Sequence, residues 1–305
     1  MAVLVARRLL DALPVLVGSS VLVFLLVHLS GDPALLMLSP DTPPEQVAEF
    51  RRAYGLDRPL HVQYLRFVGG AIRGDLGESI RFRRPALDLV LEALPATLEL
   101  AGASLVLVVG IGVPLGVLSA ARAGTAMDAA VRGLVFVGQG TPPFWLGLML
   151  IVVFAVKLRL LPSSGRGDLA QLVLPAVTLA AYFVAAVARL TRGGLVAALR
   201  SDYVRTARAK GLAPRRVLFG HALRNVLIPV VTMIGLQTGT LLGGAVVTET
   251  IFAWPGMGRL IVDSIYRRDY PVVQAAILVT VVLFVAVNLV VDLSYRLLDP
   301  RVRHE

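Results

Sequence analysis

Long apolar runs recur along the whole chain and are separated by shorter segments in which most of the charged residues lie. A helix needs roughly 20 predominantly apolar residues to cross a bilayer. Six runs reach or approach that length: Leu9–Leu29, Leu100–Ala120, Gly133–Val156, Leu172–Ala188, Val226–Thr248 and Pro271–Val291. This pattern predicts an all-α, polytopic membrane protein with six transmembrane helices.

Two of the six runs are less regular than the others. Leu172–Ala188 is close to the lower length limit for a span, and Gly133–Val156 is interrupted by Gln139-Gly140-Thr141-Pro142-Pro143. Proline lacks a backbone donor, so the carbonyl groups that it frees must be satisfied by neighbouring groups or by cavity water. The break either bends a helix that lines a transport path or serves only the close packing of helices, and the sequence leaves both interpretations open.

The first run is expected to remain as a membrane span. Arg7 and Arg8 precede it, as basic residues precede the core of a signal peptide. However, the run is longer than a signal-peptide core of about 7–15 residues, and the following Ser30-Gly31-Asp32-Pro33 has no Ala-x-Ala cleavage pattern.

The distribution of basic residues predicts the orientation of the spans. The connection 189–225 carries nine basic residues and one acid, Asp202, and short loops rich in Lys and Arg stay in the cytoplasm. With six spans both termini are then cytoplasmic, in agreement with Arg296, Arg301 and Arg303 near the C-terminus. Residues 30–96 are left outside, where eight arginines are balanced by nine acids and where long loops cross largely regardless of charge.

The external segment has the features of folded structure. Pro43-Pro44-Glu45 predicts a helix start, with a helix over Glu45–Tyr54 that ends at Gly55, and a second helix, Leu60–Gly70, follows Pro59. These helices would form a small cap over the outer mouth of the membrane domain, since a spacer would contain more Ser and Gly and fewer aromatic residues.

Three domains follow from this organisation. Residues 1–29 form the N-terminus and the first span, residues 30–96 form the extracytoplasmic segment, and residues 97–305 form a core with the second to sixth spans and the cytoplasmic connection 189–225.

Composition supports a membrane location and narrows the chemistry. Hydrophobic residues make up 56% of the 305 residues, and the mean hydropathy is +0.77. The net charge of +10 would suggest nucleic-acid binding in a soluble protein, but basic residues beside spans set topology and meet anionic headgroups. There is no cysteine, and the four histidines (His28, His61, His221 and His304) lie far apart in the sequence, so no metal site within this chain is expected.

The predicted spans contain almost no ionisable residue at their centres. Glu99, Glu249 and Asp292 fall near span ends, and the polar residues that lie deep are Gln139, Gln237 and Asn288. Proton- or sodium-coupled carriers place carboxylates or ion sites inside the membrane, so this pattern disfavours them. The sequence also lacks a G-x-x-x-x-G-K-[ST] phosphate loop. An ATP-driven transporter of this type would need a motor on another polypeptide.

The connection 189–225 predicts a helix, a turn and a second helix that leads into the fifth span. Ser201 or Asp202 can cap the first helix, Gly211 can end it in a left-handed conformation, and Pro214 suits the first turn of the next.

The spacing of residues along this short helix predicts which side chains lie on the same face. Tyr203, Thr206, Ala207 and Lys210 share one face, on which the small residues would allow close approach to a partner, and Arg205 and Arg208 lie on another side. Taken alone, the pattern is more typical of a helix on a lipid surface than of a docking helix.

Several longer motifs belong to one family pattern. They are Asp202-Tyr203-Val204-Arg205-Thr206-Ala207-Arg208-Ala209-Lys210-Gly211, His221-Ala222-Leu223-Arg224-Asn225, Ile228-Pro229, Glu249-Thr250-Ile251-Phe252-Ala253-Trp254-Pro255-Gly256-Met257-Gly258-Arg259-Leu260, Arg268-Asp269-Tyr270-Pro271, Tyr54-Gly55-Leu56-Asp57-Arg58-Pro59-Leu60, Gly74-Asp75-Leu76-Gly77 and Leu94-Pro95-Ala96-Thr97-Leu98. Over about residues 5–303 the chain resembles the permease subunits of ABC importers in the dipeptide/oligopeptide branch. Its extended outer segment resembles that of the B-type permease.

The resemblance suggests which residues carry function. It implies an ATPase-docking loop with Asp202, Tyr203, Arg205, Thr206, Ala207, Lys210 and Gly211. The family motif after the fifth span contains Glu249, Phe252, Pro255, Gly256 and Gly258. Besides these, Gln139, Pro142, Pro143 and Gln237 are candidates for the pathway or its gate, and no catalytic residue is expected.

One departure from the wider family limits what can be carried over. ABC permeases in general have Glu-Ala-Ala, three further residues and Gly in the docking loop, whereas here Arg205-Thr206-Ala207 precede Gly211. No argument can therefore rest on that glutamate.

The resemblance also implies an assembly in the bacterial inner membrane. Its expected parts are a heterodimer of two homologous permeases with the type I importer fold, two cytoplasmic ATPases that bind ATP and Mg, and an extracytoplasmic binding protein. The permease would switch between inward- and outward-facing states and hold no cofactor itself. Importers of nickel chelates, glutathione or oligosaccharides are the alternative to a peptide importer, and a stand-alone proton-coupled carrier is a third hypothesis.

Overall fold

The computed structural model describes residues 2–29, 34–35, 38 and 42–298. In this part of the chain every regular element is helical, and the only strand-like pairing is an isolated bridge between Glu78 and Pro85. The predicted all-α fold is confirmed. Arg301 and Arg303, which entered the prediction of orientation, lie outside the described residues.

The chain divides into two compact units. The first contains Met1–Pro95 and Pro255–Leu289, and the second contains Ala96–Trp254 and Val290–Glu305. This division differs from the domains drawn along the sequence, because residues 255–289 group with the N-terminal part. The physical reason is a shared apolar core, in which Leu76, Leu89 and Val90 pack with Met257 and Val272.

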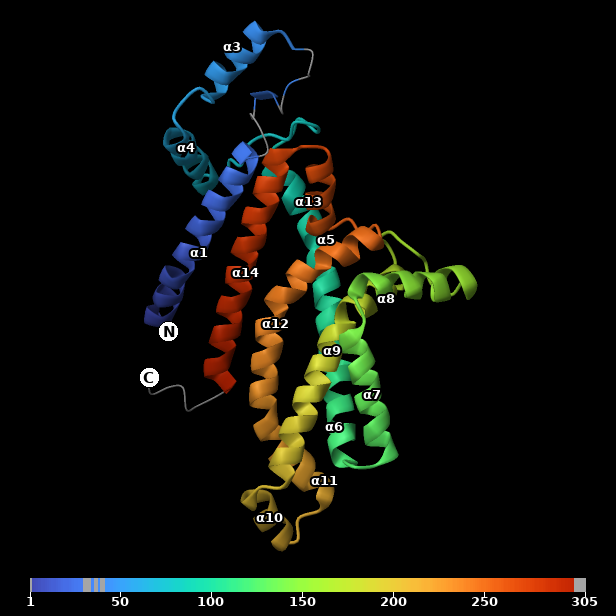
Figure 1. Cartoon of the computed structure of the whole chain (residues 1–305). Helices are drawn as coiled ribbons and strands as arrows, with labels where there is room; N and C mark the ends of the chain where they lie inside the picture. Colours follow the sequence, from blue (N-terminus) through green and yellow to red (C-terminus); the bar gives the residue numbers. More distant parts are fainter. Residues whose placement is uncertain (1, 30–33, 36–37, 39–41, 299–305) are drawn as a thin grey trace. The chain divides into compact units, whose positions relative to one another are not determined.

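The first unit contains α1, α3, α4, α13, the start of α5 and most of α14 (Figure 1). Their bounds are Ala2–Leu29 for α1, Pro44–Tyr54 for α3, Leu60–Ile72 for α4, Ala86–Leu107 for α5, Met257–Tyr266 for α13 and Tyr270–Leu298 for α14. The two helices predicted in the outer segment are confirmed as α3 and α4. As expected, α3 ends at Gly55, whose φ of +67° is a left-handed conformation that glycine adopts without strain. The location of this segment as a cap stays a prediction.

The buried carboxylate of Asp269 holds the turn that precedes α5. It accepts hydrogen bonds from Ser79 Oγ at 2.5 Å, from the backbone N–H of Ile80 at 3.1 Å and from that of Arg81 at 3.4 Å. The Ser79 hydroxyl also accepts from the N–H of Phe82 at 3.0 Å. A buried carboxylate is costly unless it is hydrogen-bonded; here three donors satisfy it, and the turn is thereby tied to the start of α14.

The second unit is built around α9 (Leu169–Leu199), a helix of 31 residues. The other helices are α6 (Val113–Ala121), α7 (Ala126–Gly140), α8 (Pro143–Leu150), α10 (Asp202–Ala209), α11 (Pro214–Arg216) and α12 (Arg224–Ile251), with π-helical segments η1 (Val108–Gly112), η2 (Ile151–Lys157) and η3 (Val217–Leu223). Helices α6, α7, α8 and α12 all pack against α9. A Cβ atom at Gly116 would lie 2.6 Å from the carbonyl oxygen of Ala188, so glycine is needed where α6 meets α9.

Five of the six predicted spans correspond to helices that are long and apolar enough to cross a membrane. Within the described residues these are Leu10–Leu29, Ala86–Ala121, Leu169–Leu199, Pro214–Leu241 and Tyr270–Val291. The fourth span, which looked short in the sequence, belongs to the long helix α9. The charged residues after Ala188 had hidden its length.

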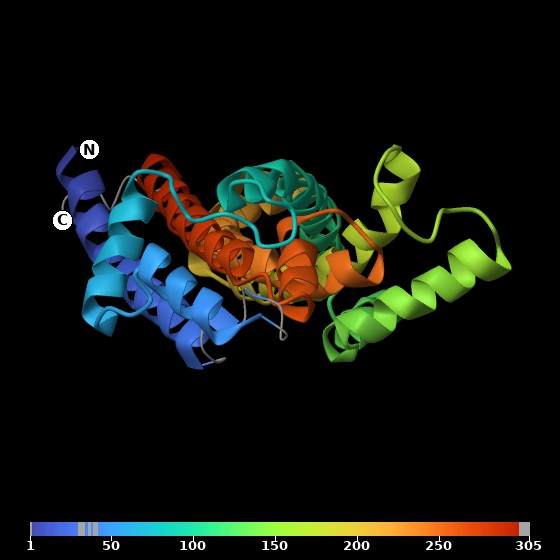
Figure 2. The same cartoon turned by 90° about the horizontal axis from the view of Figure 1, so that it is seen from above.

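The predicted third span is two separate helical segments rather than one kinked helix. Helix α7 and the segment Pro143–Lys157, which consists of α8 and η2, are long and apolar enough to cross a membrane only when taken together. They are bent by 106° where Gly140 ends one helix and Pro143 begins the other. Figures 1 and 2 show α8 leaving the direction of α7 at this point. The two consecutive prolines explain the sharp bend, because the backbone of Pro142 is extended, with ψ of 134°, and cannot continue the helix.

Replacing Asp269 with asparagine should release the turn before α5. The amide keeps the shape of the carboxylate but has only one acceptor oxygen, so at least one buried donor loses its partner, at a cost of about 1–3 kcal/mol. The turn contains Arg81, Arg83 and Arg84. We expect limited digestion with trypsin to cut after these residues faster in Asp269→Asn than in the native protein.

The matched control is Asp263→Asn on α13. Its carboxylate is 48% exposed and lies 3.7 Å from Arg259 Nε, so its removal should leave the cleavage rate unchanged. Equal cleavage rates for Asp269→Asn and the native protein would contradict the role of Asp269.

Candidate functional site

The predicted helix–turn–helix lies at one end of the second unit. Helix α9 ends at Leu199, α10 begins at Asp202, and the turn that follows α10 contains Gly211 with φ of +77° (Figure 1). Pro214 occupies the first position of α11, as predicted. Ser201, one of the two predicted caps, is the N-cap residue of α10. Its Oγ, however, donates to the carbonyl oxygen of Ala198 at 2.5 Å and makes no hydrogen bond to α10.

Helix α10 is attached to the unit through one side only. Val204 is fully buried and Ala207 is 8% exposed, and both belong to the apolar core that also contains Leu195 and Val217. Tyr203 and Thr206 are exposed. The predicted face is therefore split, because Ala207 packs inward with Val204 instead of joining Tyr203 outside. Periodicity alone could not tell which of two neighbouring stripes the short helix buries.

The exposed side of α10 and the following turn is strongly basic. Arg205 forms an ion pair with Asp202 within the helix, and the other exposed cations are Arg208, Lys210, Arg215 and Arg216. Such a surface can bind acidic side chains of a partner or lipid headgroups. Within the described residues, no three His, Asp or Glu side chains come together in a way that could hold a metal ion.

A buried ion pair fixes the helices from which α10 projects. The Asp128 carboxylate on α7 is 1% exposed and accepts from Arg192 Nε at 2.7 Å and Nη2 at 2.8 Å. It also accepts from Ser119 Oγ on α6 at 2.5 Å and from the N–H of Gly124 at 3.0 Å. Three helices and one turn thus meet at a single carboxylate. Sequence reasoning missed this cluster; its only local signal was Asp128 in the first turn of a helix capped by Thr125.

The family motif after the fifth span has a packing role at the other end of the same unit. Glu249 is buried and accepts from Thr97 Oγ1 at 2.7 Å, and the indole Nε1 of Trp254 donates to the carbonyl oxygen of Ala96 at 2.8 Å. Both bonds join the end of α12 to α5. Phe252 is fully buried as well.

The same motif holds the connection between η2 and α9. The N–H of Gly165 donates to the carbonyl oxygen of Phe252 at 3.0 Å. Arg166 donates through Nε to Glu99 at 2.8 Å, and its guanidinium carbon lies 6.0 Å from the centre of the Trp254 ring. Each of these contacts lies within the second unit.

The remaining motif residues, Pro255, Gly256 and Gly258, belong to the first unit. Gly256 is the extended residue before α13, and Gly258 is buried in the first turn of that helix. The residues of the family motif are therefore divided between two units, and the boundary falls between Trp254 and Pro255.

The pathway candidates do not form one cluster in the described structure. Pro142 and Pro143 form the break between α7 and α8 and are exposed, whereas Gln139 and Gln237 are half-buried. The side-chain oxygen of Gln237 on α12 is buried and has no hydrogen-bond partner among the described residues. A role for these four residues in the pathway stays a prediction.

Close packing is observed at α8, beside the break. A Cβ atom at Gly147 would lie 3.2 Å from the ring of Phe252 and 3.3 Å from Thr178 Cγ2. A larger residue at position 147 would therefore press on these side chains, where α8 packs against α9 and the end of α12.

Two sequence families match the chain. Residues 112–304 match the binding-protein-dependent transport system inner membrane component, and residues 1–101 match the N-terminal part of membrane components of such systems.

Curated relatives match over nearly the whole length. The di/tripeptide transport system permease protein DppB of Pseudomonas aeruginosa is 44% identical, over 99% of this chain and 98% of the relative. The oligopeptide transport system permease protein AppB of Bacillus subtilis is 41% identical over 100% of both chains. The glutathione transport system permease protein GsiC of Escherichia coli is 44% identical over 99% of both chains.

A solved structure supports the fold. The methionine ABC transporter MetNI in an inward-facing conformation contains a chain that matches 69% of this protein, with 96% of that chain covered, a TM-score of 0.58 and 21% identity. At this identity the match concerns the arrangement of helices alone.

Replacing Asp128 with asparagine should loosen the base of the α9–α10 region. The amide cannot accept both donors of the Arg192 guanidinium, which is 26% exposed and would be left without a counter-charge. We expect the Tm of the purified protein, followed by tryptophan fluorescence in detergent, to fall by several degrees.

Arg132→Gln provides the matched control for this change. Arg132 Nε lies 3.7 Å from the same carboxylate, but its side chain is 58% exposed, so it should contribute little. A Tm of Asp128→Asn that equals that of Arg132→Gln would show that the ion pair with Arg192 does not stabilise this region.

Proposed function

The chain belongs to the family of binding-protein-dependent transport system inner membrane components, and from this premise we propose that it forms half of the transmembrane pathway of an ATP-driven importer of di- and oligopeptides. It is a multi-pass membrane permease with an all-helical fold. The observation that carries the proposal is the geometry of α10: the helix is rooted in the core by Val204 and Ala207, while its other side is free to receive a partner.

The energy for transport comes from partner ATPases in this proposal. The chain has only two lysines, Lys157 and Lys210, which follow Val156 and Ala209, so neither belongs to a glycine-lysine phosphate loop. ATP and Mg are accordingly assigned to two ATPase subunits. When ATP closes these subunits, α10 moves with them, and its attachment to α9 and η3 passes the movement to the membrane helices.

The other parts of the assembly follow from the family. A homologous permease completes a heterodimer, and an extracytoplasmic binding protein delivers the substrate. Both chain termini lie in the cytoplasm, because the basic connection 189–225 is cytoplasmic and an even number of spans separates the ends. This orientation places α10 on the side where ATP is available.

Peptides are the proposed cargo because relatives named for di-, tri- and oligopeptide transport match the whole chain. A relative named for glutathione transport matches equally well, so glutathione, itself a peptide derivative, is the second candidate. Nickel chelates and oligosaccharides are further alternatives within the same architecture. A proton-coupled carrier is disfavoured, since the buried Glu249 lies at the end of α12 and is hydrogen-bonded to Thr97.

Gly211 provides a test of the docking role. No atom lies within 4 Å of the position that a Cβ would take, so a substitution meets open space and is resisted only by the left-handed backbone. Asparagine tolerates this conformation and valine does not. In vesicles that contain the complete importer, Gly211→Val should abolish dipeptide uptake and substrate-stimulated ATP hydrolysis, while Gly211→Asn should retain both.

Two controls accompany this experiment. The amount of Gly211→Val in the membrane should equal that of the native chain, and the purified chain without ATPase subunits should hydrolyse no ATP. Full uptake by Gly211→Val would refute the docking role of this turn, and hydrolysis by the chain alone, free of contaminating ATPase, would refute the assignment of the motor to a partner.

Gln237 provides a test of the pathway and of the cargo. Its unpaired, buried oxygen is suited to accept from a peptide N–H group or from the second permease. We expect Gln237→Leu to lower the rate of dipeptide uptake about tenfold, since a lost hydrogen bond to the moving substrate is worth roughly 1.4 kcal/mol. Thr240→Val, at an exposed position of the same helix, should change the rate little.

Competition in the same uptake assay identifies the preferred substrate. Unlabelled di- and tripeptides should compete with the labelled dipeptide more strongly than glutathione does. The reverse order would assign the importer to glutathione, and an unchanged rate in Gln237→Leu would remove this residue from the pathway.

A further inference from the structure

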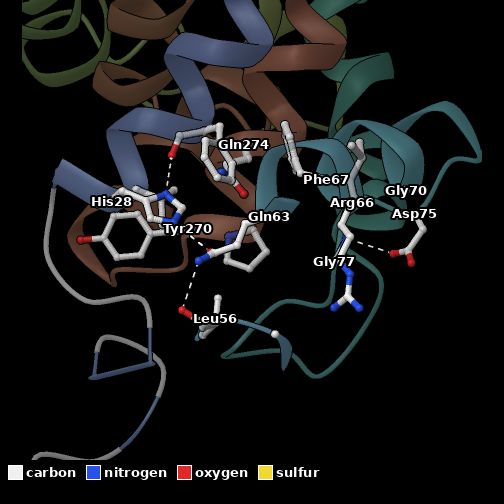
Figure 3. Close-up of a pocket in the computed structure, with 15 residues that line it drawn as sticks. His28, Leu56, Gln63, Arg66, Phe67, Gly70, Asp75, Gly77, Tyr270 and Gln274 are labelled. Atoms are coloured by element: carbon white, nitrogen blue, oxygen red, sulfur yellow. Dashed lines mark hydrogen bonds between the residues drawn. The ribbon is translucent and has the colours of Figure 1, made fainter. Parts of the chain in front are cut away.

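A cavity of about 320 Å³ lies within the first unit, apart from the residues discussed above as the docking site and the pathway (Figure 3). Its walls come from the end of α1, from α4 with the turn before it, from the turn at 75–77 and from the start of α14. Most of the lining is apolar, with Phe24, Val27, Phe67 and Leu76 among its side chains. This size and this lining fall within the range of small-ligand sites.

The polar groups on one wall already satisfy one another. His28 Nδ1 lies 3.0 Å from the carbonyl oxygen of Phe24, and His28 Nε2 lies 3.1 Å from Gln63 Oε1. The Gln63 amide donates to the carbonyl oxygens of Leu56 at 3.1 Å and Arg58 at 2.8 Å. The Phe24 and His28 rings are also in contact, with centres 4.3 Å apart and planes tilted by 40°. His28 and Gln63 thus form a network in which their polar contacts are with one another and with backbone carbonyl oxygens.

Arg66 on the other wall is different. Figure 3 shows it on the opposite side of the cavity from His28 and Gln63, near Gly77 and Asp75. Among the described residues, no acceptor lies within hydrogen-bond distance of its guanidinium and no carboxylate forms an ion pair with it. The group lies over Gly55: a Cβ atom there would be 2.4 Å from Arg66 Nη1. Arg66 is exposed, and a guanidinium has five N–H donors and no acceptor, so these donors are open to an anion that enters the cavity.

The charge of the cavity limits the anion. Asp75 also lines it, and its Oδ1 accepts from the N–H of Gly77 at 3.0 Å. A ligand group with a single negative charge would pair with Arg66 without a large repulsion from Asp75. Carboxylates and phosphodiesters have that charge, and both match the planar fork of an arginine.

The location of the cavity indicates an amphiphile. His28 lies next to the end of the candidate span Leu10–Leu29, and Tyr270 is the first residue of the candidate span Tyr270–Val291. The cavity therefore lies beside the ends of two candidate spans, and the ends of a membrane span are where lipid headgroups and acyl chains meet. We infer that this cavity binds a small acidic amphiphile, whose carboxylate or phosphate pairs with Arg66 while its apolar part packs against Phe24, Phe67 and Leu76.

The inference is tested by native mass spectrometry of the full chain, freed of copurified lipid and released from a neutral detergent. Two probes distinguish the sources of the acidic group: dioctanoyl phosphatidylglycerol stands for a membrane phospholipid, and dodecanoate stands for a free carboxylate. We expect one molecule of at least one probe to bind per chain. Arg66→Gln should weaken this binding about tenfold or more, because a charge-assisted hydrogen bond is lost.

Two further variants distinguish binding at this cavity from non-specific binding elsewhere on the protein. Arg73→Gln removes the same charge from an exposed position directly after α4 that does not line the cavity, and it should bind as the native chain does. Val27→Phe fills the cavity and should abolish binding without a change in charge. If Val27→Phe fails to fold, the comparison of Arg66→Gln with Arg73→Gln tests the inference by itself. Both positions are exposed, so neither substitution should prevent folding.

Each outcome has a defined meaning. Binding of phosphatidylglycerol alone supports a lipid site, and binding of dodecanoate alone supports a site for free acids. If neither probe binds, or if the native chain and Arg66→Gln bind equally, the inference is overturned.

Discussion

The polar groups that this protein buries must find their partners inside the protein, because an apolar layer offers none. For the backbone, this constraint selects helices. For side chains, it means that buried carboxylates accept several hydrogen bonds, as Asp128 and Asp269 do. Asp128 receives two bonds from Arg192 and further bonds from Ser119 and Gly124. Asp269 receives a hydroxyl and two backbone N–H groups.

These saturated carboxylates lie where helices are joined rather than within the spans. Each fixes the path of a connecting segment: Asp128 fixes the turn between α6 and α7, and Asp269 fixes the turn before α5. Glu249 and Trp254 do the same for the end of α12. The helices are thereby held at their ends, and the Asp128 cluster ties together the helices from which α10 projects. Contiguous packed elements of this kind are what the proposed coupling to a partner ATPase would require.

Two polar side chains, Arg66 and Gln237, have atoms without a partner among the described residues, and they are informative for that reason. Arg66 lines a cavity with no counter-ion among the described residues, and Gln237 has a buried oxygen without a donor there. A buried polar group without a hydrogen-bond partner, such as Gln237, calls for an explanation in a folded protein, and the exposed Arg66 offers donors to a ligand in the cavity beside it. The two groups therefore lead to different proposals, a bound amphiphile for Arg66 and a transported or neighbouring chain for Gln237. Neither proposal depends on the other.

The sequence by itself determined the elements of this protein, because those depend on local chemistry. Apolar run length predicted the spans, and Gly55, Gly211 and Pro214 marked helix ends through their own backbone preferences. Family motifs then identified the exposed helix–turn–helix. The sequence did not determine which side of α10 is buried or the 106° break between α7 and α8. Nor did it determine the hydrogen bonds between residues far apart in the chain, such as Arg192 with Asp128 and Ser79 with Asp269. Those features depend on which surfaces meet in three dimensions, and only the tertiary structure decides that.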